Sequence, residues 1–174
     1  PLMTLETKDA LTEFDILGFT LQYEMSYTNI LNMLDMAGIT IRASQRGEDE
    51  PIIMAGGPCA YNPEPLYDIV DFFEIGEGEE IMNEVLDVYS KYKGKGQKKE
   101  FLREISKIQG VYVPSLYDVT YKEDGTIKEF KPKFDDVPAR VKKRIVNNFD
   151  KVDFPLDMIV PYSEIVHDRV VLET

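Results

Sequence analysis

The stretch Pro51-Ile52-Ile53-Met54-Ala55-Gly56-Gly57-Pro58-Cys59-Ala60 decides the fold of this chain. It is a short apolar run that ends in glycines and opens into a helix, as a buried parallel strand does where it meets its crossover helix. The same pattern recurs in Asp71-Phe72-Phe73-Glu74-Ile75-Gly76-Glu77-Gly78-Glu79-Glu80. Open α/β sheets bind ligands outside the carboxyl ends of their strands. We therefore expect two glycine loops side by side on a ligand-binding edge of such a sheet.

The segments around these two runs alternate between strand and helix. Residues 14–21 form a third, nearly continuous apolar run, which predicts another buried strand. Apolar residues recur at helical spacing over residues 26–37, 79–93 and 99–108, so these three ranges are predicted helices. An alternation of this kind is typical of an α/β fold with a parallel sheet.

The pattern changes after residue 110. Residues 111–114 and 116–121 alternate in the strand period, and residues 126–131 return as a partner strand after a turn, which predicts a β-hairpin. From residue 137 onward the chain contains prolines, basic residues and short apolar pieces, and we interpret it as an extended arm or connector.

The charge balance argues against nucleic acid and against anionic membranes as partners. Lys and Arg total 20 and Asp and Glu total 32, a formal net charge of −12. The basic stretches 91–99 and 140–144 are interpreted as solvated faces, and Arg46 is placed in a charged surface loop. Four aromatic residues of the hairpin region are attributed to cross-strand packing rather than to base stacking: Tyr112, Tyr117, Tyr121 and Phe130.

A single cysteine, Cys59, excludes an internal disulfide and any protein-only metal or iron–sulfur site built from several cysteines of this sequence. No apolar stretch approaches the length of about 18 residues that a membrane span needs, and the start does not resemble a signal sequence. The expected location is therefore the cytoplasm. The chain lacks an initiator Met and ends on an apolar run, so we interpret it as a fragment of a longer protein.

The residues at the predicted carboxyl edge each have a functional and a structural interpretation. Gly56 and Gly57 let the backbone approach a ligand closely, and they also suit a tight turn between strand and helix. The glutamates around Gly76 disfavour a phosphate and suit a ribose hydroxyl or a helix cap better. Cys59 precedes a helix start, where its thiol pKa could be lowered, although a small core residue is the favoured interpretation. The candidate cofactor-binding residues are Thr20, Gln22, Tyr23, Gly56, Gly57, Pro58, Cys59, Gly76, Glu77, Gly78 and Glu79.

These motifs carry a resemblance to a known family. The stretch 54–65, Met-Ala-Gly-Gly-Pro-Cys-Ala-Tyr-Asn-Pro-Glu-Pro, followed by Ile-Gly-Glu-Gly-Glu at 75–79, resembles the cobalamin-binding-like domain that precedes the catalytic core in many radical S-adenosylmethionine (SAM) proteins. The wider match, from residues 17–24 and 32–38 to residues 162–169, is similar to an uncharacterised subgroup of that family. It covers nearly the whole chain.

The resemblance implies a Rossmann-like, flavodoxin-like layer that holds a corrinoid, or a remnant of such a site, against a separate barrel and positions the corrinoid or the substrate there. That barrel would carry a three-cysteine motif, a [4Fe-4S] cluster and S-adenosylmethionine, so the full-length parent is expected to be a radical SAM enzyme whose barrel is the partner of this domain. The fragment alone would perform no radical chemistry, and no catalytic or metal-ligating residue is assigned in it. The Asp-x-His-x-x-Gly motif of His-ligated cobalamin domains is missing, because the single histidine is His167. Cobalamin is thus expected without a histidine lower ligand.

The predicted fold class is therefore α/β: a Rossmann-like three-layer sheet over residues 1–110, truncated at its N-terminus, followed by the hairpin and connector over 111–174. An uncovered sheet edge would invite a second copy of the chain, which suggests a homodimer. Two other functions stay open. The domain could be a structural or docking module that has lost corrinoid binding, or it could bind a nucleotide or flavin.

Overall fold

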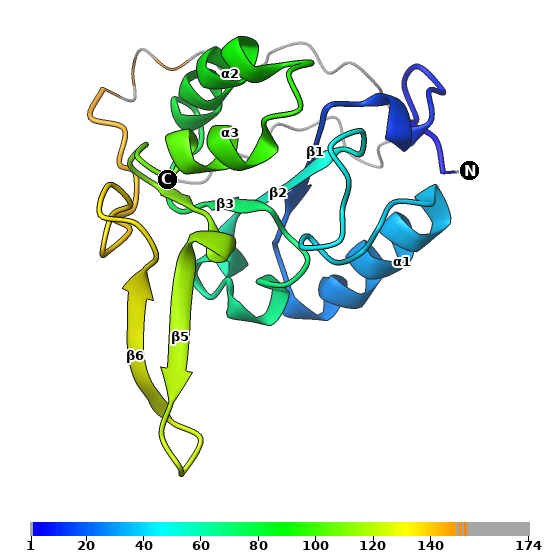
Figure 1. Cartoon of the computed structure of the whole chain (residues 1–174). Helices are drawn as coiled ribbons and strands as arrows, with labels where there is room; N and C mark the ends of the chain where they lie inside the picture. Colours follow the sequence, from blue (N-terminus) through cyan, green and yellow to red (C-terminus); the bar gives the residue numbers. More distant parts are fainter. Residues whose placement is uncertain (1, 149, 151, 153–174) are drawn as a thin grey trace, which may run out of the picture.

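Three short apolar runs form the parallel strands at the centre of the molecule. The computed structural model describes residues 2–148, 150 and 152. Strands β1 (Ile16–Thr20), β2 (Ile52–Gly56) and β3 (Phe72–Glu74) pair in parallel in that order (Figure 1). The three predicted strands are confirmed. Runs that are apolar on both faces form central strands because such runs are stable only when both faces are covered.

Helices cover both faces of the sheet. Helix α1 (Tyr27–Ala37) lies on one face, and α2 (Ile81–Tyr92) and α3 (Lys98–Ile105) lie together on the other (Figure 1). Each helix buries part of the apolar stripe that predicted it, such as Leu34 in α1 and Val85 in α2, although Leu86 of α2 is 46% exposed. The α/β class is confirmed, and the layered arrangement is compatible with a Rossmann-like fold.

Short 3₁₀ turns connect the main elements. The segment after β2, which was expected to form one short helix, instead forms two turns at Pro58–Tyr61 and Glu64–Leu66. Further turns lie at Leu11–Glu13, Glu24–Ser26 and Pro114–Leu116. Near the start of the chain, Met3 and Ala10 form an isolated antiparallel bridge outside the main sheet.

The predicted hairpin is present and projects from the body of the domain. Strands β5 (Tyr117–Tyr121) and β6 (Ile127–Pro132) form their own two-stranded antiparallel sheet (Figure 1). The rings of Tyr117 and Phe130 stack at its base, with centroids 4.9 Å apart, as expected for aromatic packing between strands.

One strand lies in a different sheet from the one expected. Residues 111–114 were grouped with the hairpin, but β4 (Val111–Tyr112) pairs antiparallel with β3 and completes the main sheet. Val111, Tyr112 and Val113 are all buried. The alternating pattern identifies a strand but not its partner, and this is why the sequence could not assign the sheet.

Two basic residues that were expected at the surface are buried. The Arg46 guanidinium lies 2.5 Å from Asp71 Oδ2, with both side chains almost fully covered. Arg46 also donates to the carbonyl oxygens of Thr40, Ile41 and Ile69, so the 39–50 loop is pinned to the sheet rather than exposed. The Lys98 side chain, which is 10% exposed, lies largely covered beside the same carboxylate. A charge that gains a buried partner far away in sequence leaves no local pattern from which burial can be predicted.

Several expectations fall outside the described residues: His167, the family-like stretch 162–169 and the strand-like runs near the end of the chain. The homodimer stays a prediction; in the part of the chain that is described, β1 forms one edge of the sheet. None of the helices in the described ranges combines the length and apolar character of a membrane span.

Candidate functional site

The two glycine loops leave the same edge of the sheet, as predicted. Thr20 of β1 is paired with Gly56 of β2, and Gly56 in turn lies beside Glu74 of β3, since a Cβ built on Gly56 would be 3.7 Å from Glu74 Cβ. Paired residues of neighbouring strands project to the same face of a sheet. Gly56 therefore leaves a notch between the side chains of Thr20 and Glu74 at the carboxyl edge.

Glu74 is the most unusual group at this edge. The residue is 8% exposed, and no hydrogen-bond donor among the described residues reaches its Oε1 atom. Burial raises the pKa of this carboxyl to about 7, because desolvation disfavours the charged form. The second glycine loop is close, since a Cβ built on Gly78 would lie 3.2 Å from Glu74 Oε2. Glu74 thus sits between both loops with unused hydrogen-bonding capacity.

The first loop packs against the end of β1. Gly57 adopts φ +95°, and a Cβ there would lie 3.1 Å from the backbone nitrogen of Leu21. Leu21 donates to the Gly56 carbonyl over 2.7 Å, and Cys59 donates to the Leu21 carbonyl over 2.9 Å. The close approach that Gly57 permits is therefore an approach to this chain's own backbone.

The second loop is paired with the connector. Arg144 N donates to the Ile75 carbonyl over 2.9 Å, and Glu77 N donates to the Arg144 carbonyl over 3.2 Å. Gly76 has φ +104°, and any side chain there would collide with the Arg144 backbone. We call residues 143–146 the connector strap.

Side-chain contacts hold the connector strap in place. The Arg144 guanidinium forms an ion pair with Glu84 at 2.5 Å and a longer one with Glu80 at 3.4 Å. The carboxylate of Glu77 accepts a hydrogen bond from Val146 N. Arg144, which was expected on a solvated basic face, is thus held beside the second glycine loop. The Glu77 carboxylate contacts the backbone of this same chain.

The remaining candidate residues form a solvent-facing rim beside the first loop. Gln22, Thr20 and Pro58 are exposed, and Tyr23 is 61% exposed. The half-buried Cys59 has a raised thiol pKa, first because of desolvation and then because of the negative charge of Glu24. This direction contradicts a lowered thiol pKa and favours a packing role for Cys59. On the other side of the edge, Glu79 is exposed just before α2.

A metal centre has no counterpart in the described ranges, where no group of three or more His, Cys, Asp or Glu residues is placed to hold an ion. The polar groups at the edge are the exposed side chains of Thr20, Gln22 and Tyr23 and one buried carboxyl, that of Glu74. These suit an uncharged polar ligand or a protein surface better than an ion.

Residues 1–114 match the model of a protein family described as radical SAM proteins, N-terminal. This chain belongs to the radical SAM N-terminal family. The matched residues contain the whole main sheet, all three helices and both glycine loops, whereas the hairpin and the connector strap lie beyond them. The match establishes the radical SAM part of the resemblance, and the corrinoid stays a prediction.

A curated relative of this radical SAM N-terminal domain is an uncharacterised protein of Methanocaldococcus jannaschii. The two are 34% identical over 98 residues, which cover 51% of this chain and 20% of the relative. The matched part is therefore about a fifth of the relative's length. No solved structure matches the chain.

Sequence reasoning missed two residues of this radical SAM N-terminal domain that shape the edge. Glu74 was interpreted as part of an apolar strand. An acidic residue inside a run of buried positions is unusual, and this could have marked it as a candidate site residue. Arg144 could not have been found in this way, because its contacts with Glu84 and Gly76 span 60 and 68 positions of sequence.

Proposed function

We propose that this chain is the accessory domain of a radical SAM protein and that the carboxyl edge of its sheet positions a corrinoid, or the substrate, beside the iron–sulfur barrel. The observation that carries the proposal is the buried Glu74 carboxyl, which adjoins the Gly56 notch and has an oxygen without a hydrogen-bond donor in the described residues. Buried polar groups are normally satisfied, and an exception at a sheet edge favours a missing ligand.

The chemistry of the edge fits such a ligand. A corrinoid carries amide groups around its ring, and an amide can donate to a carboxylate or accept from a carboxylic acid. With a pKa of about 7, Glu74 can play either part near neutral pH. Tyr23, which is 61% exposed, adds a flat apolar surface on which a ring can lie.

A docking function is the second candidate, and it also has a specific observation in its favour. The spaces above Gly57 and Gly76 are filled by this chain's own backbone, at Leu21 and Arg144, so neither glycine requires an external ligand. Tyr23, Met25 and Tyr61 are exposed near the ends of β1 and β2 and would suit a contact with a second domain.

The test uses the full-length parent protein incubated with hydroxocobalamin and then desalted. The corrinoid proposal expects a retained visible spectrum and expects Gly56→Ala to reduce retention by about tenfold or more, because the methyl group fills the notch beside Glu74. Gly56 has ordinary φ and room for a methyl group, so the variant should fold.

Gly18→Ala is the matched control. Gly18 lies two residues before Thr20 on the same face, and a Cβ there would make an ordinary 3.5 Å contact with Met54. It should leave retention unchanged. A parent protein that retains no corrinoid would overturn the corrinoid proposal and favour docking. Equal retention by both variants would show that the Gly56 notch is not part of the binding site.

A further inference from the structure

The β5–β6 hairpin has one apolar face and one polar face. Residues that pair across two strands project to the same side of a sheet. The pairs on one side are all aromatic or aliphatic: Tyr117 with Pro132, Val119 with Phe130, and Tyr121 with Ile127. The pairs on the other side are polar: Asp118 with Lys131, and Thr120 with Glu129. The hairpin is therefore amphipathic along its whole length.

A β-bulge near the tip completes the apolar face. The register shifts between Thr120 and Tyr121, so that Ile127 is the partner of Tyr121. An unshifted register would pair Tyr121 with Lys128 instead, because Thr120 pairs with Glu129. Bulges re-aim side chains in this way. This bulge thus replaces a charged residue of the apolar face with a large aliphatic one.

The apolar face is covered at the base of the hairpin and bare toward its tip. Tyr117 is 6% exposed, and Phe130, which stacks on it, is 40% exposed. Farther out, Tyr121 is 63% and Ile127 is 57% exposed, where the hairpin projects away from the body of the domain (Figure 1). A two-stranded sheet by itself is marginally stable at best in water, so a bare apolar face on such a sheet favours a partner.

The size of the bare patch restricts the kind of partner. Tyr121, Ile127 and Phe130 together expose about 300 Å², given their exposed fractions and the roughly 150–250 Å² of a large aromatic side chain. A stable complex between separate molecules buries about 800 Å² on each partner. A second copy would also bring a second net charge of −12, which opposes self-association. A contact within one polypeptide needs less area, because the covalent link keeps both surfaces at a high effective concentration.

The position of the hairpin in the chain indicates which part of the polypeptide it contacts. The match to the radical SAM N-terminal family ends at residue 114, just before β5 begins at Tyr117. The hairpin and the connector strap therefore follow the family domain and precede the next domain of a longer protein. The matched part of the Methanocaldococcus jannaschii protein is 20% of its length, which leaves room for further domains in that relative. Consecutive parts of a chain usually lie beside one another.

We propose that the apolar face of the hairpin docks onto an apolar surface patch of the domain that follows this chain in the full-length radical SAM protein. Tyr121 and Ile127 form the centre of the contact. The polar face stays in water, where Lys131 and Glu129 form an exposed ion pair at 3.3 Å. This inference rests on the accessory-domain part of the proposed function and is independent of the corrinoid, because the hairpin contributes no residue to the Gly56 notch.

The experiment is photo-cross-linking in the full-length parent protein. Tyr121→p-benzoylphenylalanine places an aromatic photoreactive group on the apolar face, and Thr120→p-benzoylphenylalanine places the same group on the polar face as the matched control. After irradiation, denaturing electrophoresis separates products within one polypeptide from products between copies, and mass spectrometry identifies the cross-linked peptides. We expect position 121 to cross-link within one polypeptide to peptides beyond residue 174, and position 120 to give none of this product.

A second pair of variants tests the contact without changing the probe. In the protein labelled at position 121, Ile127→Thr keeps a β-branched side chain but removes apolar area, so it should lower the yield at least about threefold. Lys131→Thr introduces the same residue on the opposite face of β6 and should leave the yield unchanged. The Tm of each variant reports whether it folds, and the comparison of positions 120 and 121 decides the proposal if Ile127→Thr does not.

Four results would overturn the proposal. Cross-links from position 121 to a second copy would assign the face to a homodimer, and cross-links confined to residues 1–174 would assign it to this domain itself. No product would show that the face stays in solvent, and equal yields from positions 120 and 121 would show no preference for the apolar face. Retention of hydroxocobalamin is measured separately on the same parent protein, so failure of the corrinoid proposal and failure of this one are distinguishable.

Discussion

The two edges of the sheet differ in whether a buried carboxyl group has partners. At the amino edge, Asp71 is buried but receives hydrogen bonds from Arg46 at 2.5 Å and from Ile53 N at 2.7 Å. At the carboxyl edge, Glu74 is equally buried and lacks a cationic partner among the described residues. A buried carboxylate with partners on several segments holds the scaffold together, whereas one without a partner costs stability and is a candidate for function.

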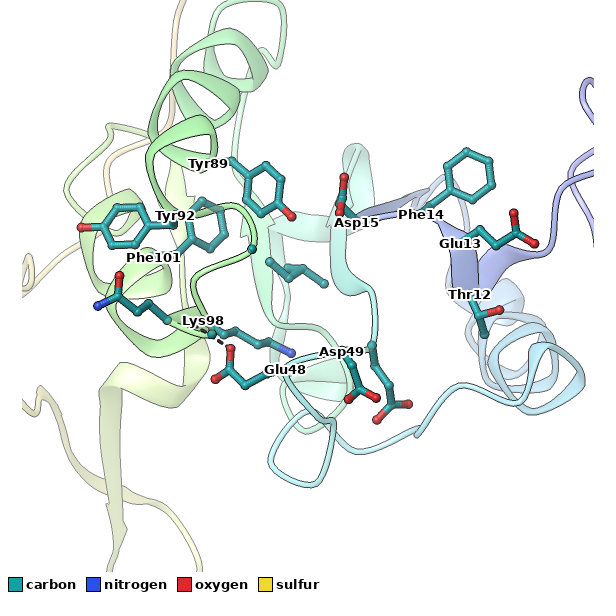
Figure 2. Close-up of a pocket in the computed structure, with 15 residues that line it drawn as sticks. Thr12, Glu13, Phe14, Asp15, Glu48, Asp49, Tyr89, Tyr92, Lys98 and Phe101 are labelled. Carbon is teal, nitrogen blue, oxygen red and sulfur yellow. Dashed lines mark hydrogen bonds between the residues drawn. The ribbon is translucent and has the colours of Figure 1, made fainter.

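The edges also differ in how the chain closes them. The connector strap pairs with Gly76 just after β3, and the first glycine loop packs on the end of β1. The amino edge is hollowed by a cavity of about 280 Å³, and the rings of Tyr89, Tyr92 and Phe101 are among its lining (Figure 2). Three measurements on this chain test whether the two edges differ in this way.

The largest expected effect is at Asp71. Asp71→Asn removes the negative charge that Arg46 and Lys98 share, and breaking a buried ion pair in this way typically costs about 3–5 kcal/mol. Urea denaturation measures the loss. Asp68→Asn is the matched control, because the Arg42–Asp68 pair is as short, at 2.6 Å, but is solvent-exposed and should contribute less than about 1 kcal/mol. Similar losses in both variants would contradict a special role for burial.

Glu74 should make the chain less stable as pH rises. Its pKa is raised from 4.5 to about 7 on folding, so the folded state keeps a proton that the unfolded state releases between these values. The stabilisation from this proton is complete below pH 4.5 and is lost as pH rises through 7, by up to about 3 kcal/mol at 1.36 kcal/mol per pKa unit. Glu74→Gln cannot ionise. Its stability relative to the native chain, from urea denaturation at pH 5 and pH 8, should therefore increase with pH, and a constant difference would show that Glu74 has an ordinary pKa.

The connector strap provides the smallest effect. Gly76→Ala should cost about 1–3 kcal/mol more than Gly94→Ala, because both glycines have positive φ but only at Gly76 does a side chain collide with another segment, at Arg144. Hydrogen exchange of the Arg144 amide should also accelerate in Gly76→Ala, since this amide donates to Ile75. Equal costs and an unchanged exchange rate would show that the strap does not depend on Gly76.

Local patterns predicted most of the fold. The runs that became β1, β2 and β3 and the periodic segments that became α1, α2 and α3 were identified within about three residues of their observed ends. The glycines after β2 and β3 also predicted that two loops share one edge, because parallel strands must end together. Whether these loops bind a cofactor is a prediction that the Gly56→Ala experiment addresses.

What the amino-acid sequence determined by itself was the type and order of the elements and the family to which they belong, because periodicity and turn residues act over a few neighbouring positions. The contact partners depend on the folded chain: Asp71 for Arg46, β3 for β4, Arg144 for Gly76, and the segments that enclose the amino-edge cavity. These contacts join residues far apart in sequence, such as Gly76 and Arg144, which are 68 positions apart, and Asp15 and Lys93, which are 78 positions apart. Burial, pKa and cavity shape depend on such distant neighbours, so no local sequence pattern predicts them.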